Sequence, residues 1–246
     1  MKIGGYMEVF AKSDIGKARD KNQDYFYIPK EEGDIDLLIL ADGMGGYNGG
    51  ELASKIAVDS AKEYICNNYN PEVPREEILV LIKKAMEYAN IKVYERAQEQ
   101  EELEGMGTTL EICLINKNKV YIGHIGDSRV YRIRKQFMRR LTTDHSYVEE
   151  LVKDGKITRE EAWHHPKKNM LMKALGCEET IEPDVMVKGF LKGDILLISS
   201  DGLTNMIREN EIYDIVTQER INVDELIDKA NDAGGLDNIT VIVAKN

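Results

Sequence analysis

Four aspartates lie at the ends of apolar, strand-like stretches of this chain. The stretches 37–41, 120–125 and 195–200 each run into an aspartate, and another aspartate stands just before the stretch 239–243; the four are Asp42, Asp127, Asp201 and Asp237. A charged carboxylate at the mouth of a buried strand is costly unless a cation compensates it. Four carboxylates in the same setting therefore predict a shared divalent metal centre.

Magnesium and manganese fit such a centre because both ions prefer hard oxygen ligands. Gly43, directly after Asp42, permits a turn in which a backbone carbonyl can also reach the metal. Several carboxylates held together repel one another, and two ions bridged by a carboxylate and a solvent oxygen would relieve that repulsion. The ions would also lower the pKa of the bridging water, which predicts a nucleophilic hydroxide at neutral pH.

Arg19 extends this chemistry toward a phosphate group. It lies five residues before Asp24 in the polar loop 16–24. Its planar, permanently charged fork suits a tetrahedral oxyanion better than the point charge of a lysine does. Taken singly, an arginine in a polar loop is a solvated surface residue and an Asp-Gly pair is a turn. The predicted metal and phosphate site therefore depends on these residues occurring together.

The four histidines are expected to lie outside the metal centre. His124 is inside a strand-like stretch, where a packed or hydrogen-bonded ring is the simpler interpretation, and His145 belongs to an Asp-His-Ser turn that it can orient. His164 and His165 are expected to face solvent. None has zinc-like spacing to a cysteine or to another histidine, so we assign no metal to them.

The composition restricts the possible partners and the compartment. The formal net charge of −11 argues against nucleic acid as a partner. Three cysteines far apart in the chain fit a reducing cytosol and not a disulfide framework. No apolar run reaches the roughly 18 residues that cross a bilayer, and residues 1–10 lack a signal-peptide pattern. We expect a soluble cytoplasmic protein without a membrane partner.

Periodicity predicts an α+β fold with helices packed outside antiparallel sheets. Residues 110–141 have the turn-linked strands of an antiparallel meander, and residues 146–176 are expected to form a helical flap outside the sheet. We expect one domain over residues 1–246, without internal repeats or linkers. Strands are expected near 9–11, 25–28, 37–41, 110–115, 120–125, 128–133, 137–141, 185–187, 194–199 and 239–243, and helices near 51–66, 78–93, 209–218 and 223–231.

These residues fall into short motifs that resemble one protein family along essentially the whole chain. The family is the metal-dependent serine/threonine protein phosphatases of the protein phosphatase 2C type, in their compact bacterial form. Each motif is weak alone, but all seven occur in the family's order. The motifs are Arg19–Asp24, Ala41–Gly46, Gly107–Thr109, Gly126–Tyr131, Thr143–Ser146, Ser199–Leu203 and Asp237–Thr240.

The resemblance implies a role for each aspartate at the strand ends. Asp42 would bridge two core Mn²⁺ or Mg²⁺ ions, and the carbonyl of Gly43 would bind one of them. Asp201 and Asp237 would hold the other ion. Asp127, with help from Asp201, would bind the third ion that bacterial relatives have.

The resemblance also implies the reaction and its setting. Asp24 would position metal-bound water and Arg19 would grip the substrate phosphate. The protein would hydrolyse phosphoserine and phosphothreonine monoesters of phosphorylated proteins through a metal-bridging hydroxide, without a phosphoenzyme. The family fold is a sandwich of two antiparallel β-sheets flanked by pairs of antiparallel helices. A monomer that opposes a serine/threonine kinase in signalling is expected.

Three positions depart from the family's pattern. Gln23 stands where the first motif usually has glutamate, which removes one negative charge near the metals. Animal relatives have a histidine at the place of Met44, and bacterial relatives often have one at the place of Tyr47. Neither residue can supply an imidazole here, so the group that protonates the leaving alkoxide stays unassigned.

Two other classes of protein fit part of the pattern. A two-metal phosphodiesterase or nuclease would use the same ligands, although the acidic charge counts against it. A non-catalytic regulatory domain could keep the fold and bind phosphoproteins. Such degenerate relatives usually lose a ligand aspartate, whereas all four are present in this chain.

Overall fold

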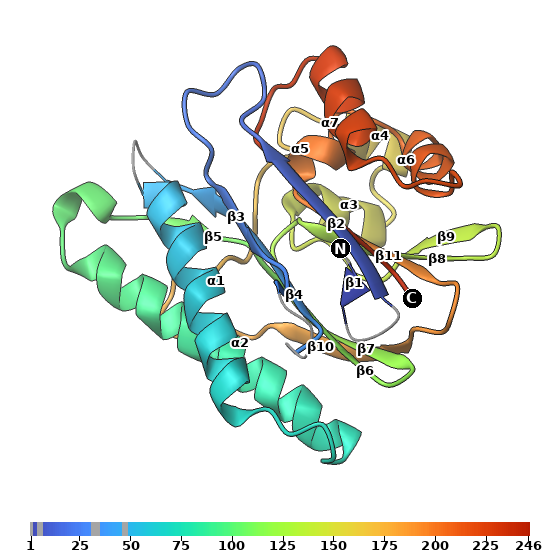
Figure 1. Ribbon diagram of the computed structural model, residues 1–246. Coiled ribbons are helices and arrows are strands. Elements are labelled where there is room, and N and C mark those ends of the chain that lie inside the picture. The colour runs from blue at the N-terminus through green and yellow to red at the C-terminus, as the bar shows by residue number, and fades with distance from the viewer. Residues whose placement is uncertain (1, 4–6, 31–34, 46–48) are drawn as a thin grey trace.

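Two antiparallel β-sheets form the centre of the computed structural model, which describes residues 2–3, 7–30, 35–45 and 49–246 (Figure 1). The strands are β1 Lys2–Ile3, β2 Met7–Asp14, β3 Asp24–Tyr27, β4 Leu37–Met44, β5 Gly107–Thr108, β6 Leu110–Asn116, β7 Lys119–Ile125, β8 Arg129–Arg134, β9 Phe137–Arg140, β10 Asp184–Gly189, β11 Ile195–Ser199 and β12 Ile239–Lys245. One sheet has the order β1-β2-β12-β11-β8-β9. The other has the order β10-β7-β6-β4-β3, with β5 paired to β4.

Alternating side chains of the strands supply two different cores. Leu38 and Leu40 of β4 belong to the core between the sheets, together with residues of β7, β8, β11 and β12. Leu37 and Ile39 point to the opposite face and pack under helices. Because successive side chains of a strand point to opposite faces, a strand covered on both sides is apolar throughout. This explains the continuous apolar stretches and confirms the predicted α+β sandwich.

Helices cover the outer face of each sheet (Figure 1). The long helices α1, Gly49–Asn68, and α2, Arg75–Gln98, pack on the sheet that contains β4. The shorter helices α5, Asp201–Thr204, α6, Glu209–Val216, and α7, Val223–Asp232, pack on the sheet that contains β12. A short 3₁₀ turn, Glu101–Leu103, follows α2. The predicted helices are confirmed, with α1 and α2 a few residues longer than expected.

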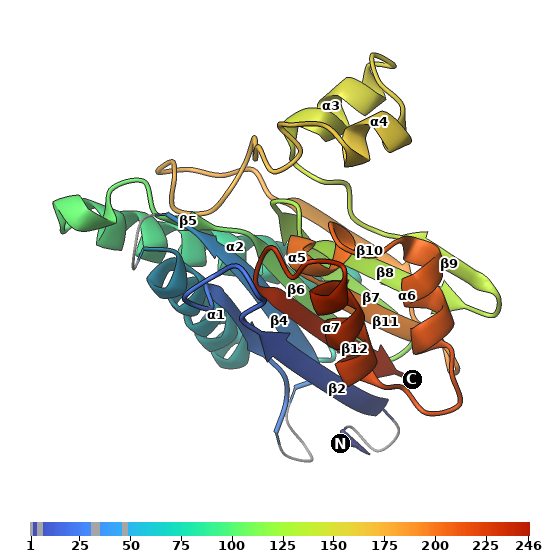
Figure 2. The same ribbon diagram turned by 90° about the horizontal axis from the view of Figure 1, so that it is seen from above.

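The two short helices of residues 146–176, which we call the flap, stand apart from both sheets (Figure 2), whereas Leu175 at its end is hydrogen-bonded to Thr108 of β5. The flap contains α3, Tyr147–Lys153, and α4, Arg159–Trp163. Ser146 caps the first helix, and Thr158 forms a reciprocal capping box with Glu161 at the start of the second. Local capping therefore specifies both short helices, although they bury little apolar surface against the sheets.

The predicted meander over residues 110–141 is wrong in one respect. Strands β6 and β7 form one hairpin and β8 and β9 another, but the two hairpins belong to different sheets. The chain crosses between the sheets at Gly126, whose φ of +111° favours glycine because other residues have a Cβ that clashes there. The crossing brings Asp127 to the edge where the sheets meet.

No helix in the described ranges is long and apolar enough to cross a membrane.

Candidate metal centre

Strand pairing brings the predicted aspartates to one end of the sandwich. Asp24 on β3 pairs in register with Asp42 on β4, so both lie in one sheet. Asp201 follows β11 and Asp237 precedes β12, and these strands are neighbours in the other sheet. The hydroxyl of Ser200 donates a hydrogen bond of 2.8 Å to Asp24 Oδ2 and joins the two sheets at this end.

The carboxylates are close enough to raise one another's pKa. Burial raises the pKa of Asp42 well above its ordinary value, and four neighbouring charges add to this: Asp24, Asp201, Asp127 and Asp237. Burial and the charge of Asp201 also raise the pKa of Asp127. Burial and the charge of Asp237 raise the pKa of Asp201 to about 6. The predicted aspartates therefore form one acidic cluster.

Asp24 is the most deeply placed member of this cluster. Only 7% of the residue is exposed, and Oδ1 has no hydrogen-bond partner among the described residues. Burial raises its pKa to about 7, against the hydrogen bond from Ser200. An unpartnered buried carboxylate oxygen is costly, so this atom is a natural acceptor for a polar ligand.

Other side chains hold two of the aspartates in the present arrangement. Arg19 Nη2 lies 2.7 Å from Asp237 Oδ2, and Asn205 Nδ2 donates a hydrogen bond of 2.8 Å to Asp201 Oδ2. Within the described ranges, no three His, Cys, Asp or Glu side chains already form a group that could hold a metal ion. The acidic residues are thus adjacent, but they have not converged on one point.

The chemistry of the cluster nevertheless fits divalent cations. Its donors are carboxylate oxygens, the ligands that Mg²⁺ and Mn²⁺ prefer, and cations would relieve the mutual repulsion. Gly43 allows the backbone to approach closely, because a Cβ at this position would lie 2.0 Å from the carbonyl oxygen of Gly50. Only glycine therefore lets the end of β4 pack against the start of α1 beside Asp42.

Asn238 positions the loop that carries Arg19. Its side-chain Nδ2 donates hydrogen bonds to the carbonyl oxygens of Ile15 (2.9 Å) and Lys21 (2.8 Å). Its Oδ1 accepts a hydrogen bond of 2.8 Å from the backbone N–H of Gln23. One buried amide thus ties both ends of the loop to the start of β12, and Arg19 projects from it with half of its side chain exposed.

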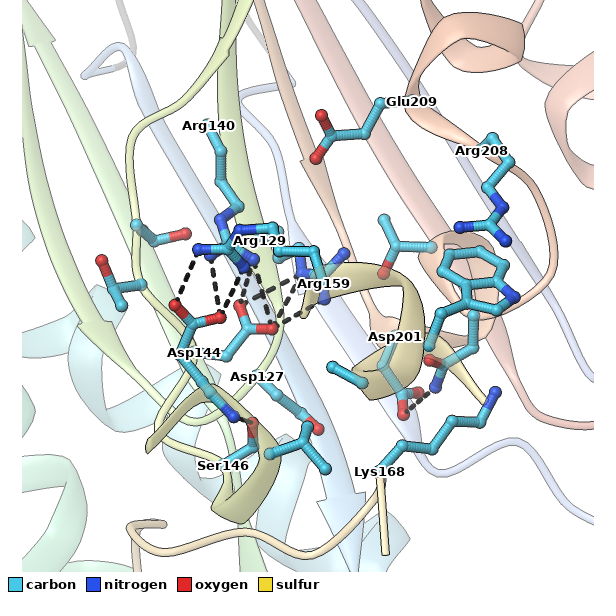
Figure 3. Close-up of a pocket in the computed structure, with 18 of the residues that line it drawn as sticks. Asp127, Arg129, Arg140, Asp144, Ser146, Arg159, Lys168, Asp201, Arg208 and Glu209 are labelled. Atoms are coloured by element: carbon cyan, nitrogen blue, oxygen red, sulfur yellow. Dashed lines mark hydrogen bonds and ion pairs between the residues drawn. The ribbon is translucent and has the colours of Figure 1, made fainter. Parts of the chain in front are cut away.

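A pocket of about 750 Å³ opens beside the cluster, between the flap and the sheets (Figure 3). Asp127 and Asp201 line its wall. Basic side chains were not predicted here, because they come from strands, the flap and the start of α6; they are Arg129, Arg140, Arg159, Lys168 and Arg208. Arg208 lies 3.9 Å from the Trp163 ring and pairs with Glu160, so it connects the flap to α6.

The histidine predictions are confirmed for His124 and His145. His124 is fully buried and hydrogen-bonded, and His145 bonds to the backbone at Gly126. His164 is exposed as expected, but His165 is half-buried beside the Tyr147 ring, because the flap folds back on itself. Of the departures, Gln23 Nε2 lies 3.5 Å from the carbonyl oxygen of Gly45, whereas Tyr47 lies outside the described residues.

Comparison with known proteins agrees with the fold. The profile of the family described as protein phosphatase 2C matches residues 17–226. Protein phosphatase PhpP of Streptococcus pneumoniae is 42% identical over 238 residues, which cover 96% of each chain. The crystal structure of serine/threonine phosphatase Stp1 from Staphylococcus aureus is 35% identical, with a TM-score of 0.91 over 100% of this chain and 97% of that one.

A third relative has metal ions in its structure. The catalytic domain of serine/threonine protein phosphatase PstP, solved in complex with two manganese ions, is 33% identical with a TM-score of 0.84, over 97% of both chains. The chain belongs to the protein phosphatase 2C family. It is a protein-serine/threonine phosphatase, and its substrates are phosphoproteins.

Proposed function

We propose that the acidic cluster binds two core Mn²⁺ or Mg²⁺ ions and a third ion, and that it hydrolyses phosphoserine and phosphothreonine directly. Asp42 and the carbonyl of Gly43 would hold the core ions together with Asp201 and Asp237, and Asp127 would serve the third. The observation that carries the proposal is the rise in the pKa of Asp42, Asp127 and Asp201, caused by burial and by neighbouring carboxylates, which bound cations would reverse. The two manganese ions of PstP support it.

The side chains of the cluster then have separate tasks. When bound, the ions supply Lewis acidity at the phosphate and lower the pKa of water. Asp24 accepts a hydrogen bond from the attacking water through its free Oδ1. Arg19, released from Asp237, binds two phosphate oxygens with its guanidinium fork. Charge that develops on the phosphate oxygens is therefore stabilised from two sides.

Direct attack by water fits the surroundings of Ser200, whose hydroxyl is hydrogen-bonded to Asp24. Ser200 Oγ donates to Asp24 Oδ2 and accepts a hydrogen bond of 2.9 Å from the backbone N–H of Thr240. Ser200 is 0% exposed, so its hydroxyl is a structural link between the sheets and is not open to a phosphate group. Hydrolysis would therefore proceed without a phosphoenzyme.

We also propose the cellular setting. A serine/threonine kinase would produce the phosphoproteins that this enzyme dephosphorylates in signalling, and a monomer acting in the cytoplasm would suffice. Three cysteines far apart in the chain fit a reducing compartment.

Hydrolysis of a phosphothreonine peptide, with and without Mn²⁺ and beside a phosphotyrosine peptide, tests the proposal. Asp201→Asn should reduce kcat/KM for the phosphothreonine peptide by more than about 100-fold, because losing a ligand costs more than losing its support. Asp232→Asn is the matched control: the residue is exposed and pairs only loosely with Lys17, at 3.6 Å. It should keep full activity.

Two results would contradict the proposal. Undiminished activity after chelation would exclude the metal role of the cluster. Equal losses in the two variants would exclude Asp201 as a ligand, even if the wild-type enzyme depends on Mn²⁺.

A further inference from the structure

A fully buried ion pair lies close to the metal centre without belonging to it. Glu111 on β6 and His124 on β7 face each other in register, and both side chains are 0% exposed. His124 Nδ1 lies 2.5 Å from Glu111 Oε1. The second carboxylate oxygen of Glu111 has no partner among the described residues.

The other nitrogen of His124 reaches the start of the flap. Nε2 lies 2.8 Å from the carbonyl oxygen of Thr143, so this nitrogen must carry a hydrogen and donate it. Although burial lowers the pKa of His124, the adjacent carboxylate of Glu111 outweighs burial and raises it to about 9. Burial also raises the pKa of Glu111 to about 7. Whichever partner holds the proton between Nδ1 and Oε1, the contact with Glu111 orients the ring so that Nε2 points to Thr143.

His145 connects the His124 ring to the turn before Asp127. Its ring stacks on the His124 ring, with centroids 4.6 Å apart. Its backbone N–H donates to the carbonyl oxygen of Gly126 (2.7 Å), and its Nδ1 accepts from the N–H of Gly126 (3.2 Å). The backbone N–H of Met172, at the far end of the flap, donates to the carbonyl oxygen of His145 (2.7 Å).

These contacts join three parts of the molecule that are distant in sequence. Hydrogen bonds and one ring stack connect the Glu111–His124 pair, which lies within one sheet, to both ends of the flap and to Gly126, the residue before Asp127. A buried ion pair loses the hydration of both charges, and apolar residues of similar volume often stabilise the folded state equally well or better. The Glu111–His124 pair does fix the orientation of the imidazole ring, and so the position of its second nitrogen.

We propose that Glu111 and His124 are positioning residues that set Asp127 and the flap relative to each other. The inference rests on the proposed metal role of Asp127. His124 is fully buried, so it would touch neither the substrate nor the predicted ions. It acts through the Thr143–His145 segment, which fixes the backbone on one side of Asp127 and anchors the flap that lines the adjoining pocket.

Two amide substitutions of His124 separate the role of its hydrogen bond to Thr143 from its contribution to thermal stability. In His124→Gln the amide nitrogen can take the place of Nε2 and still donate to Thr143, whereas the shorter side chain in His124→Asn reaches only the place of Nδ1. Both variants lose the ring and the ion pair, so we expect similar losses of thermal stability. We expect His124→Asn to raise the Mn²⁺ concentration for half-maximal phosphothreonine-peptide hydrolysis by about 10-fold or more, and His124→Gln to raise it less than about threefold.

The flap supplies a readout that does not depend on activity. Trp163 in α4 is the only tryptophan of the chain, so its fluorescence reports on the flap. Acrylamide should quench it more strongly in His124→Asn than in wild type, and as in wild type in His124→Gln. Failure of the wild-type enzyme to respond to Mn²⁺ would sink the proposed function, whereas the quenching experiment would still test the positioning role.

Equal Mn²⁺ requirements and equal quenching in the two variants, with only stability changed, would overturn the proposal. If neither variant folds, the same connection can be tested at His145. His145→Asn can retain the acceptor for the Gly126 N–H and His145→Gln cannot, so only the glutamine should raise the Mn²⁺ requirement. Identical behaviour of these two variants would overturn the proposal equally.

Discussion

At the scale of single residues, Arg19 and Asp237 each occupy the other's charged group. Their contact of 2.7 Å pairs the residue predicted to bind phosphate with a residue predicted to bind metal. The hydrogen bond to Asp237 raises the pKa of Arg19 further above its ordinary value, so the guanidinium charge is constant at any working pH. A cation on Asp237 would free the arginine, which links metal binding to phosphate binding through one ion pair.

Arg19→Lys should therefore damage substrate use even though the charge is kept. A lysine cannot present two parallel N–H groups to a phosphate, and a hydrogen bond to a charged group is worth about 1.5–3 kcal/mol. We expect kcat/KM for a phosphothreonine peptide to fall about 10- to 100-fold, measured at saturating Mn²⁺. Lys17→Met, in the same exposed loop, is the control and should change kcat/KM less than about twofold. Comparable losses in both variants would mean that the loop supplies only diffuse charge.

At the scale of elements, one residue from the far end of the chain makes side-chain hydrogen bonds to both ends of the loop between β2 and β3. Asn238 makes three hydrogen bonds to the backbone of residues 15–23 and is 4% exposed. These bonds hold the Arg19 loop where β12 begins. Asn238, which follows the predicted metal ligand Asp237, thus positions Arg19, the residue predicted to bind phosphate.

Asn238→Ala should release this loop. Buried backbone groups left without partners cost about 1–3 kcal/mol, and 1 kcal/mol corresponds to roughly 2–4 °C in Tm for a chain of this size. Trypsin should cleave near Arg19 faster than in wild type. Asn116→Ala, which also removes a side-chain hydrogen bond to a backbone carbonyl, at Pro71, should leave this cleavage unchanged. If both variants are cut at the wild-type rate, Asn238 does not hold the loop.

At the scale of the whole molecule, contacts along the chain were predictable and contacts between the sheets were not. The strands and the aspartates at their ends follow from apolar runs that stop at turn residues. The Ser200–Asp24 link joins strands of different sheets, whose neighbours periodicity cannot identify. The meander prediction failed for the same reason, because hairpin patterns do not show that Gly126 carries the chain into the other sheet.

The same distinction explains what could be foreseen of the site. The sequence identified Asp42 and Asp201 as candidate ligands because each follows an apolar, strand-like stretch. The basic wall of the adjoining pocket was not visible, because Arg129 and Lys168 reach it from different elements and the flap places one of them. A single sequence without pairing information therefore predicts the ligands of the site better than its surroundings.

Repulsion among the carboxylates of the acidic cluster should lower the stability of the metal-free protein. Four charges add to burial in raising the pKa of Asp42, so Asp42→Asn relieves repulsion and can donate to a neighbouring carboxylate. Without metal, we expect its Tm to rise by roughly 3–8 °C, as for about 1–3 kcal/mol in a chain of this size. Saturating Mn²⁺ should reverse the order, because an ion that binds only the folded state stabilises it, by about 2.7 kcal/mol at 100 times Kd.

Thermal unfolding in chelator and in a Mn²⁺ series measures this reversal directly. Asp232→Asn should follow the wild-type curve, since this exposed residue lies outside the cluster. Wild-type and Asp42→Asn curves that run parallel at all Mn²⁺ concentrations would show that Asp42 contributes no ligand. A reversal would show that the charges which bind the ions are the same charges that oppose folding without them, so the stability of the whole molecule depends on its catalytic cations.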